Sequence, residues 1–250
     1  MGKLFDFELV FTQIPELLKK LPITLELALL AMLLGLALGL LMAVIKIKKV
    51  PVLCQITNFL ISLVRGTPVI VQLYIAFFGL PMIFKYFNQQ FGTNLAVAEI
   101  PGFVYAVAAL GLNESAYCAE IIRSALQSVN EGQIEAATAL GMTYLQALRR
   151  IILPEAIEVA LPTLGNSMIS IIKSTSLAFT CAVVEITAQG KILAGKTYRY
   201  FEAYVSLAII YWVLTIIIEQ GIRFIEKKIK IPDQVALVTE AGEDSKHDKN

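Results

Sequence analysis

The chain has 250 residues, of which 57% are hydrophobic and 16% are charged. With a mean hydropathy of +0.70, this composition excludes an ordinary soluble domain and predicts an integral membrane protein. The 21 basic and 20 acidic side chains leave a net charge of +1, which excludes the basic surface that nucleic-acid binding requires. Cys54, Cys118 and Cys181 lack paired spacing and predict neither a disulfide framework nor a metal site.

The first 22 residues form a segment of mixed character ahead of the apolar part of the chain. Apolar residues recur at helical spacing within residues 1–20, for example at Phe7, Phe11 and Leu18. This spacing predicts an amphipathic helix that lies on a membrane surface. Acidic residues interrupt the apolar centre that a cleaved signal peptide requires, so we expect the segment to be retained.

A first membrane span is predicted at residues 23–45, because about 20 apolar residues cross the hydrocarbon core. Gly35 and Gly39 form a small-residue face on which another helix can pack closely. The positive-inside rule places the end of this span in the cytoplasm, and the amino terminus outside. Three lysines follow the span directly: Lys46, Lys48 and Lys49.

Residues 51–64 are apolar with polar interruptions, which indicates either an interfacial connecting helix or the first turns of the next span. The segment Arg65-Gly66-Thr67-Pro68 then indicates a gate or helix break, because proline fits best in the first turn of a helix and arginine can reach the interface. A second span is predicted at residues 69–84, followed by an outer loop at residues 85–100.

Three further spans are predicted at residues 101–122, 157–172 and 201–225, with a short helix and an outer loop at residues 177–200. The fold class is therefore an all-α integral membrane protein. Its transmembrane domain covers residues 23–230 and has five spans, with the amino terminus outside and the carboxyl terminus in the cytoplasm. Residues 231–250 form a charged tail that we expect to be cytoplasmic and disordered.

The loop at residues 124–155 is the longest water-compatible segment in the middle of the chain. Good helix formers at residues 133–139 predict one short helix, and Gly141 permits a sharp turn after it. A second helix is predicted at residues 144–152 and should end ahead of Pro154, since proline disfavours helix in the residue before it. Two short helices at an angle could dock in a cleft of a partner protein. The alternative is an ordinary amphipathic hairpin between two spans.

These motifs resemble one family. Glu135-Ala136-Ala137, followed by Gly141 and by Ile152-Leu153-Pro154, resembles the EAA loop in the membrane subunits of binding-protein-dependent ABC importers. Two further segments are similar to the polar amino-acid branch of that family, which includes permeases for histidine, glutamate, glutamine, arginine and cystine. They are Arg65-Gly66-Thr67-Pro68 with Gln72-Leu73, and Lys173-Ser174-Thr175-Ser176-Leu177.

The resemblance implies a permease subunit of the type I ABC importer kind, located in the bacterial cytoplasmic (inner) membrane. Its implied partners are membrane lipid, a second permease that is identical or a paralogue, two cytoplasmic ATP-binding subunits and an extracytoplasmic amino-acid-binding protein. The chain itself would be no enzyme and would hold no cofactor, because ATP and magnesium would bind to the partner ATPase. Six loop residues would couple to that ATPase: Glu135, Ala136, Ala137, Gly141, Arg149 and Arg150.

Ionisable side chains inside predicted spans are costly and therefore indicate a functional role. At about 1.5 Å per residue, Glu114 and Lys173 both fall near the middle of the bilayer. A carboxylate and an ammonium group at one depth can neutralise each other, or they can bind the two ends of a zwitterion. The alternative is a set of structural ion pairs between helices. We predict a substrate pathway lined by Glu114, Tyr117, Glu120, Asn166, Lys173, Ser174 and Ser176.

The predicted substrate rests on the same resemblance. Residues 173–180 and the segment Arg199-Tyr200-Phe201-Glu202-Ala203-Tyr204 are similar to permeases for cystine and related sulfur amino acids. Basic-amino-acid permeases often have an acidic residue where this chain has Ser174, which argues against a cationic substrate. The unbalanced carboxylate of Glu114 argues for one. We expect cystine or a related amino acid, with basic amino acids (arginine, lysine or histidine) and glutamine as the alternatives.

Residues 190–197 match the phosphate-binding P-loop pattern, which would suggest an ATPase. That pattern binds phosphate only between a buried strand and a helix, with an aspartate at the end of another apolar strand. Here the segment is expected outside the cytoplasm. None of the four aspartates ends an apolar strand: Asp6, Asp233, Asp244 and Asp248. We therefore predict a chance match.

Two other functions are compatible with the residues. A channel or ion-coupled carrier would use Glu114, Glu120 and Lys173 for protons, and it predicts uptake driven by a proton gradient without ATP. A membrane enzyme is disfavoured, because the sequence contains no metal-ligand cluster and no set of nucleophile and base.

Overall fold

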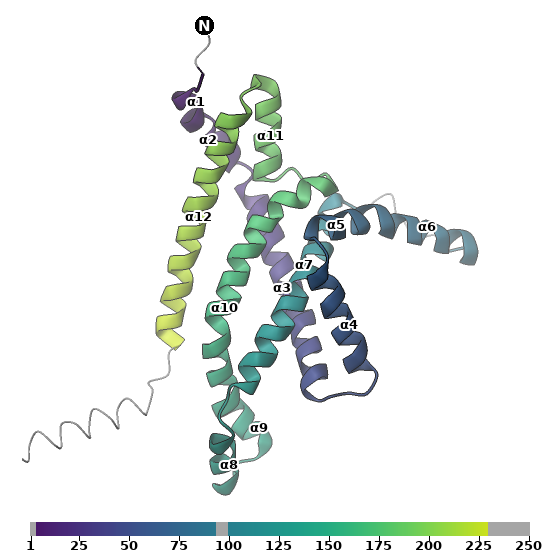
Figure 1. Cartoon of the computed structure of the whole chain (residues 1–250), viewed down its shortest axis with the longest axis vertical. Coiled ribbons are helices and arrows are strands. Elements are labelled where there is room, and N and C mark those ends of the chain that lie inside the picture. The colour runs from purple at the N-terminus through teal and green to yellow at the C-terminus, as the bar shows by residue number, and fades with distance from the viewer. Residues whose placement is uncertain (1–3, 94–99, 230–250) are drawn as a thin grey trace, which may run out of the picture.

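Long helices run lengthwise through the molecule, and shorter helices lie at both of its ends (Figure 1). The computed structural model describes residues 4–93 and 100–229, and every regular element within these ranges is a helix. The length of the molecule is carried by α3 (Leu21–Ile47), α7 (Gly102–Gln127), α10 (Leu153–Ser174) and α12 (Tyr200–Ile229). The all-helical fold class expected from the sequence is confirmed.

Helices α3 and α7 pack at very short range, because two glycines of α3 lie in their contact. A Cβ built on Gly35 would lie 2.9 Å from the Cβ of Glu114, and one on Gly39 would lie 2.6 Å from the Cβ of Cys118. Carbon atoms in ordinary contact are about 3.5–4.0 Å apart, so no larger residue fits at either position. The predicted small-residue face is confirmed, and it packs against the helix that carries Glu114.

The N-terminal segment packs on the rest of the protein. The single amphipathic helix expected at residues 1–20 is wrong, because the chain forms two short helices. These are α1 (Phe7–Thr12) and α2 (Ile14–Leu18). Pro15 has no N–H with which to continue the first helix. Between the two helices, the buried side chain of Gln13 donates a hydrogen bond of 2.7 Å to Ser206 Oγ on α12.

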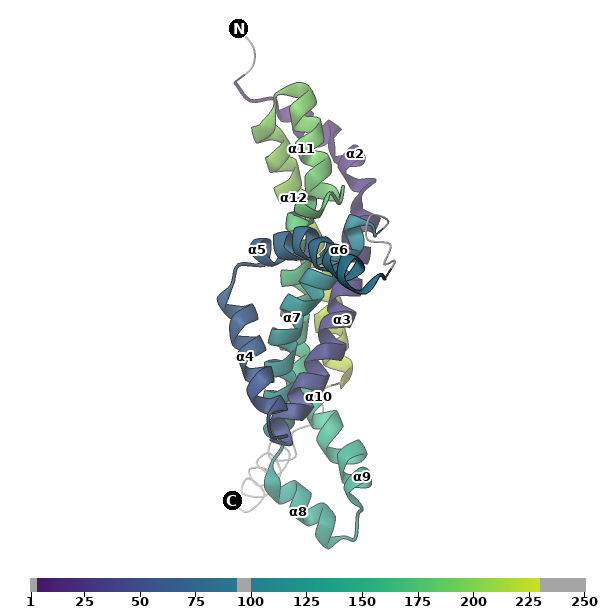
Figure 2. The same cartoon turned by 90° about the vertical axis from the view of Figure 1, so that its right-hand side faces the viewer.

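A sharp turn at Thr67 and Pro68 separates the helix over residues 53–66 from the predicted second span. The helical elements there are α4 (Leu53–Gly66), α5 (Val69–Tyr74), the π-helical turn η1 (Ile75–Gly79) and α6 (Leu80–Phe91). Helix α4 runs beside α7, whereas α5 and α6 extend sideways from the body (Figures 1 and 2). The outer loop expected to start at residue 85 starts later, because α6 continues to Phe91. Gly92, with a φ of +61°, ends that helix.

The two short helices expected in the central loop are confirmed, and they lie at one end of the molecule (Figure 2). They are α8 (Glu131–Ala139) and α9 (Tyr144–Ala147). Gly141 lies between them with a φ of +78°, the left-handed conformation that glycine adopts without steric cost. Thr143 and Gln146 form a capping box at the start of α9, which fixes where that helix begins.

The helix that begins with α9 does not end ahead of Pro154, so that expectation is wrong. The chain continues through a π-helical turn, η3 (Leu148–Ile152), directly into α10. Across this wider turn the N–H of Leu153 bonds to the carbonyl of Leu148. Pro154 therefore falls in the first turn of the next α-helical segment, where its missing N–H is tolerated. The α8–α9 hairpin and α10 are joined by one continuous helix.

The interruption expected at residues 173–176 is confirmed. Helix α10 ends there, and the 3₁₀-helix η4 (Thr175–Cys181) follows it. Ala182, with a φ of +60°, then turns the chain toward α11 (Ile186–Thr197), and the helix direction bends by 57° across the break. Residues 190–197 lie inside α11, so the P-loop pattern forms no loop that could hold a phosphate.

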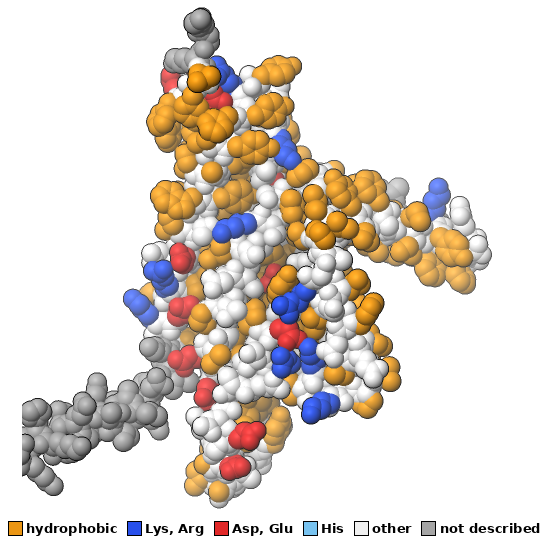
Figure 3. Space-filling view, in the orientation of Figure 1, with side chains coloured by type: hydrophobic (Ala, Val, Ile, Leu, Met, Phe, Trp, Pro, Cys, Tyr) orange, Lys and Arg blue, Asp and Glu red, His pale blue; other side chains and the backbone are white. Residues whose placement is uncertain are grey.

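Three helices in the described ranges are long and apolar enough to cross a membrane: α3, the continuous segment Val69–Phe91 and α12. The bent pair Tyr144–Cys181 and Ile186–Thr197 is a fourth candidate. In Figure 3, apolar side chains cover α5, α6 and one end of α12, whereas most charged side chains gather toward the other end of the molecule. The count of five spans and their orientation stay predictions. The charged tail at residues 231–250 lies outside the described residues.

Replacing Gly39 with alanine should lower the melting temperature of the detergent-purified protein, because the new methyl group would overlap Cys118 and the backbone of Ala119. We expect the free energy of unfolding to fall by about 1–3 kcal/mol, the usual cost of adding a carbon to a well-packed contact. Gly221→Ala is the matched control, since Gly221 lies in α12 with open space around it. A melting temperature as high as that of the control would contradict the close contact between α3 and α7.

Candidate functional site

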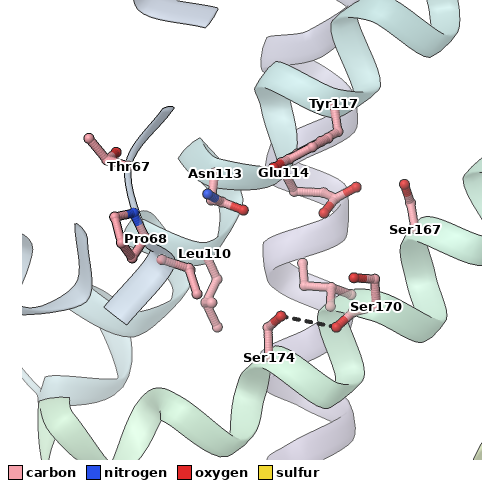
Figure 4. A pocket seen from close by; sticks show the side chains of 11 residues that line it. Thr67, Pro68, Leu110, Asn113, Glu114, Tyr117, Ser167, Ser170 and Ser174 are labelled. Carbon is pink, nitrogen blue, oxygen red and sulfur yellow. Dashed lines mark hydrogen bonds between the residues drawn. The ribbon is translucent and has the colours of Figure 1, made fainter. Parts of the chain in front are cut away.

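A polar cavity of about 340 Å³ lies between the α4–α5 turn, α7 and α10 (Figure 4). Its polar side chains come from all three elements, and they are Thr67, Asn113, Glu114, Tyr117, Ser167, Ser170 and Ser174. Pockets for small molecules in proteins have volumes of about 300–1,000 Å³. The cavity is therefore large enough for a small polar molecule, and it brings together three predicted site residues, Glu114, Tyr117 and Ser174, with the predicted break at Thr67 and Pro68.

The turn beside the cavity is held by the side chain of Gln72. Pro68 has no N–H, so the carbonyl of Val64, four residues earlier, lacks its helical partner. Gln72 Nε2 donates to that carbonyl over 2.8 Å, and it is also 2.8 Å from Thr67 Oγ1. The amide oxygen of Gln72 accepts a hydrogen bond of 3.0 Å from Asn113 Nδ2 on α7. The turn is thus tied to the helix that carries the acidic residue of the cavity.

Glu114 contributes a carboxylate from the buried face of α7. Only 6% of this residue is exposed, because α3 packs over its base at Gly35. The carboxylate lies 3.8 Å from Cys118 Sγ and points toward the hydroxyl of Ser167 (Figure 4). No lysine or arginine within residues 4–93 and 100–229 forms an ion pair with it. A buried carboxylate in this state favours a ligand that brings a positive charge.

Helix α10 presents a row of hydroxyl groups to the cavity. Ser167, Ser170 and Ser174 are three and four residues apart, which places them on one face of the helix. Ser174 Oγ donates to the carbonyl of Ser170 over 3.0 Å, so its lone pairs are available to accept from a ligand (Figure 4). Sequence reasoning missed Ser167 and Ser170, and also Gln72 as the residue that holds the turn. The helical spacing of the serines is the signal that could have identified them.

Tyr117 lines the cavity one turn after Glu114 and contacts Arg65. The guanidinium carbon of Arg65 lies 5.5 Å from the centroid of the Tyr117 ring, within the range of a cation–π interaction. Arg65 belongs to the last turn of α4, two residues before Thr67, which itself lines the cavity. A cation from the predicted break is therefore held beside the predicted substrate residues.

Glu120 is engaged in an ion-pair cluster away from the cavity. Its carboxylate binds Lys46 at the end of α3, and it lies 2.8 Å from an Arg123 nitrogen on its own helix. Arg123 also donates to Gln127 over 2.6 Å. The side chains of Lys46 and Glu120 are only 18% and 25% exposed, so this cluster ties α3 to α7. The sequence analysis allowed either a substrate-binding role or a structural ion pair for this residue. The geometry of Glu120 is that of a structural ion pair between helices.

The remaining predicted pathway residues lie outside the cavity wall. Lys173 and Asn166 are exposed and Ser176 is half-buried. Within the described part of the chain, Lys173 forms no ion pair with Glu114, so the mutual neutralisation considered from the sequence is not seen. Their roles in substrate binding stay predictions.

A second buried carboxylate, that of Glu185, lies at the break before α11 and was given no role by the sequence. It caps that helix by accepting from the Ala188 N–H over 2.8 Å, and it accepts from the Tyr211 hydroxyl over 3.2 Å. Its position just ahead of a helix is the signal for this role. The described residues contain no group of three histidine, cysteine, aspartate or glutamate side chains that could hold a metal.

The predicted coupling residues lie at the end of the molecule opposite the N-terminal helices (Figure 1). Glu135 and Ala136 are exposed on α8, whereas Ala137 is buried within the hairpin. Arg149 and Arg150 are exposed where the hairpin passes into α10. The hairpin therefore offers acidic and basic side chains on a surface that nothing in the described chain covers.

The chain matches the family model described as a binding-protein-dependent transport system inner membrane component, over residues 35–231. It is 45% identical, over 212 residues, to the probable amino-acid permease protein YxeN of Bacillus subtilis (strain 168), covering 85% of this chain and 90% of that protein. The L-cystine transport system permease protein TcyL of the same organism is 38% identical over 239 residues, covering 96% of this chain and 97% of that protein.

A solved structure is also similar. The crystal structure of an amino acid ABC transporter with histidines matches with a TM-score of 0.75 and 37% sequence identity, covering 90% of this chain and 99% of that chain. The match extends over nearly all the elements described above, so the fold around the cavity is shared with that transporter.

Replacing Gln72 with leucine should destabilise the turn beside the cavity, because it leaves the Val64 carbonyl and the Asn113 amide without their partners. A fully buried polar group left unpaired costs about 1–3 kcal/mol, and these two groups are partly buried, so we expect the lower part of that range and a lower melting temperature of the purified protein. Gln55→Leu is the matched control, since Gln55 is exposed on α4. If both variants melt at the wild-type temperature, Gln72 does not hold the turn.

Proposed function

This chain belongs to the family of binding-protein-dependent transport system inner membrane components, and we propose from that membership that it moves a polar amino acid across the bacterial cytoplasmic membrane. Proteins of this family are permease subunits of ABC transporters, so the chain is a transport subunit and not an enzyme. Membership also implies ATPase and substrate-binding partners and a dimeric arrangement. The exact composition we propose is two permease chains, identical or paralogous, with two ATP-binding subunits and one extracytoplasmic amino-acid-binding protein.

The observation that carries the proposal is the polar cavity beside the α4–α5 turn. An amino acid combines an ammonium group with a carboxylate, and a polar one adds hydrogen-bonding groups in its side chain. Glu114 is placed to bind the ammonium group, because its buried carboxylate has no cation from the described chain. Asn113 and the serine row of α10 offer hydrogen bonds to the rest of the molecule. Broken helices hold polar substrates in other transporters in a comparable way.

Further contacts along the pathway are proposed for three residues outside the cavity of the single chain, Asn166, Lys173 and Ser176, and for Glu120 only in a state in which its ion pairs with Lys46 and Arg123 are broken. We propose that the break at Thr67 and Pro68 acts as a gate, because it is the point where α4 and α5 change direction beside the cavity. A second permease chain would complete the pathway between the two copies.

Transport by alternating access requires that the state of the ATPase reaches the cavity. The α8–α9 hairpin, with Glu135, Ala136, Ala137 and Gly141, would dock on the ATPase, and Arg149 and Arg150 would bind at its edge. Because α9 continues through η3 into α10, a movement of the hairpin would be transmitted along one helix to the serine row. ATP binding would draw the hairpins of two permeases together and open the cavity outward.

For the substrate, we propose cystine or a related sulfur amino acid. The relative named for L-cystine transport covers almost the whole chain, which supports this choice. The hydroxyl of Ser174 in the cavity wall adds no charge, which supports a substrate of zero net charge such as cystine. Basic amino acids and glutamine are the alternatives, and Glu114 is the residue that supports a basic one.

The proposal is tested by reconstituting the complex in lipid vesicles, with its ATPase and binding protein, and measuring uptake of labelled amino acids. We expect uptake that requires ATP and is confined to a few polar amino acids. Deleting residues 133–141 should abolish both ATPase binding and uptake, because it removes most of α8 and the turn at Gly141.

The control for this deletion is membrane insertion, measured by fractionation, which should be unchanged because no long helix is altered. ATPase binding retained by the deletion variant would refute the coupling assignment. Uptake driven by a proton gradient without ATP would favour an ion-coupled carrier instead.

A further inference from the structure

Two side chains of opposite charge flank the cavity without pairing with each other. Glu114 is 94% buried within the α3–α7 contact and forms no ion pair among the described residues, as shown above. Arg65 is exposed at the end of α4, and within residues 4–93 and 100–229 it likewise forms no ion pair with a carboxylate. The proposed substrate carries an ammonium group that could pair with Glu114 and a carboxylate that could pair with Arg65.

The position of Arg65 is fixed from two directions. Its guanidinium carbon lies over the ring of Tyr117, at 5.5 Å from the ring centroid, and Tyr117 lines the cavity. Its backbone precedes the turn at Thr67, which Gln72 holds by hydrogen bonds to Thr67 and Val64. A cation–π contact uses no N–H group of the arginine as a hydrogen-bond donor to a carboxylate, so these groups stay available for one.

The other cations near the cavity are less well placed. Lys46 and Arg123 are both bound to Glu120. Lys173 precedes Ser174 in α10 and, like Arg65, is exposed and lies outside the cavity wall, but among the described residues it forms no ion pair or cation–π contact with a residue of that wall. Arg65 contacts a residue of the cavity wall, and a guanidinium group can bind the two oxygens of a carboxylate at once.

We propose that Arg65 is the specificity-determining residue that binds the carboxylate of the transported amino acid, opposite Glu114, which binds the ammonium group; this inference rests on the proposed function. One negative and one positive group together balance a zwitterion of zero net charge. A basic amino acid would bring a net positive charge that neither its own carboxylate nor a second carboxylate in the cavity wall balances, whereas the two ammonium groups of cystine are balanced by its two carboxylates. The pair therefore selects neutral polar amino acids against basic ones.

The test measures binding rather than uptake, because the binding protein would otherwise filter the substrates. Affinities for labelled L-cystine, L-glutamine and L-arginine are measured on the purified permease–ATPase complex without binding protein. In the wild type, a neutral amino acid should bind more tightly than arginine. Arg65→Gln should weaken neutral binding by about 10- to 100-fold, the usual loss for a charge-assisted hydrogen bond, and should weaken arginine binding less. The preference then shifts toward arginine.

Three variants separate a specific role from a general one. Arg65→Lys keeps the charge and should retain part of the neutral preference. Glu114→Gln should weaken every substrate without shifting the preference toward arginine. Arg223→Gln is the matched control, since Arg223 forms an exposed ion pair on α12 and should leave all affinities unchanged. Melting temperature and ATPase binding are recorded for each variant to show that it folds. If Arg65→Gln does not fold, Arg65→Lys and Tyr117→Leu replace it in the test. Both should bind neutral amino acids more weakly than the wild type does.

The outcomes distinguish the role of Arg65 from the proposed importer function. An unchanged ratio of neutral to arginine affinity in Arg65→Gln overturns the role of Arg65 while leaving the importer assignment intact. A ratio that shifts in Lys173→Gln and not in Arg65→Gln assigns the carboxylate to Lys173 instead. A wild-type complex that binds no amino acid and shows no ATP-dependent uptake overturns both the proposed function and this inference.

Discussion

The close contact of α3 with α7 positions the chemistry of this molecule. It exists because Gly35 and Gly39 present no side chain, so the backbone of α3 can lie against Glu114 and Cys118. This contact buries the base of Glu114 and leaves its carboxylate directed toward α10 (Figure 4). At the other end of the same helix pair, the Lys46–Glu120 ion pair keeps α3 and α7 together. The two helices form a fixed frame, and the segments that change direction lie beside it.

Two helix breaks flank this frame, and a side chain stabilises each of them. Backbone groups released by a break cannot bond to lipid, so they need a partner inside the protein. Gln72 provides it at the turn before α5, where Pro68 interrupts the hydrogen-bond pattern. Glu185 provides it at the start of α11, after the 3₁₀ segment. The cavity lies on the first of these breaks, and α10 connects it without interruption to the α8–α9 hairpin.

Much of the fold follows from properties that the sequence shows directly. Apolar length predicts α3 and α12, glycine predicts a close-packing face on α3 and the turn at Gly141, and the polar stretch predicts the α8–α9 hairpin. The features that the sequence does not predict correctly depend on tertiary contacts. The chain passes Pro154 without a stop because a π turn shifts the hydrogen bonds ahead of it, and spacing alone cannot show that shift. Likewise, a sequence shows that Glu114 and Glu120 are acidic, but only packing decides which one meets a cation.

The central claim is that the cavity beside α10 lies on the transport path, and the most direct measurement is the accessibility of position 174 to a membrane-impermeant thiol reagent. Ser174→Cys is introduced into a complex whose native cysteines have been replaced by alanine, and labelling is compared from each side of the membrane. If the cavity is on the path, labelling should occur from the cytoplasmic side without nucleotide and from the outside with ATP trapped. The transported amino acid should protect against it. Labelling from one side in both states, unaffected by substrate, would contradict the claim.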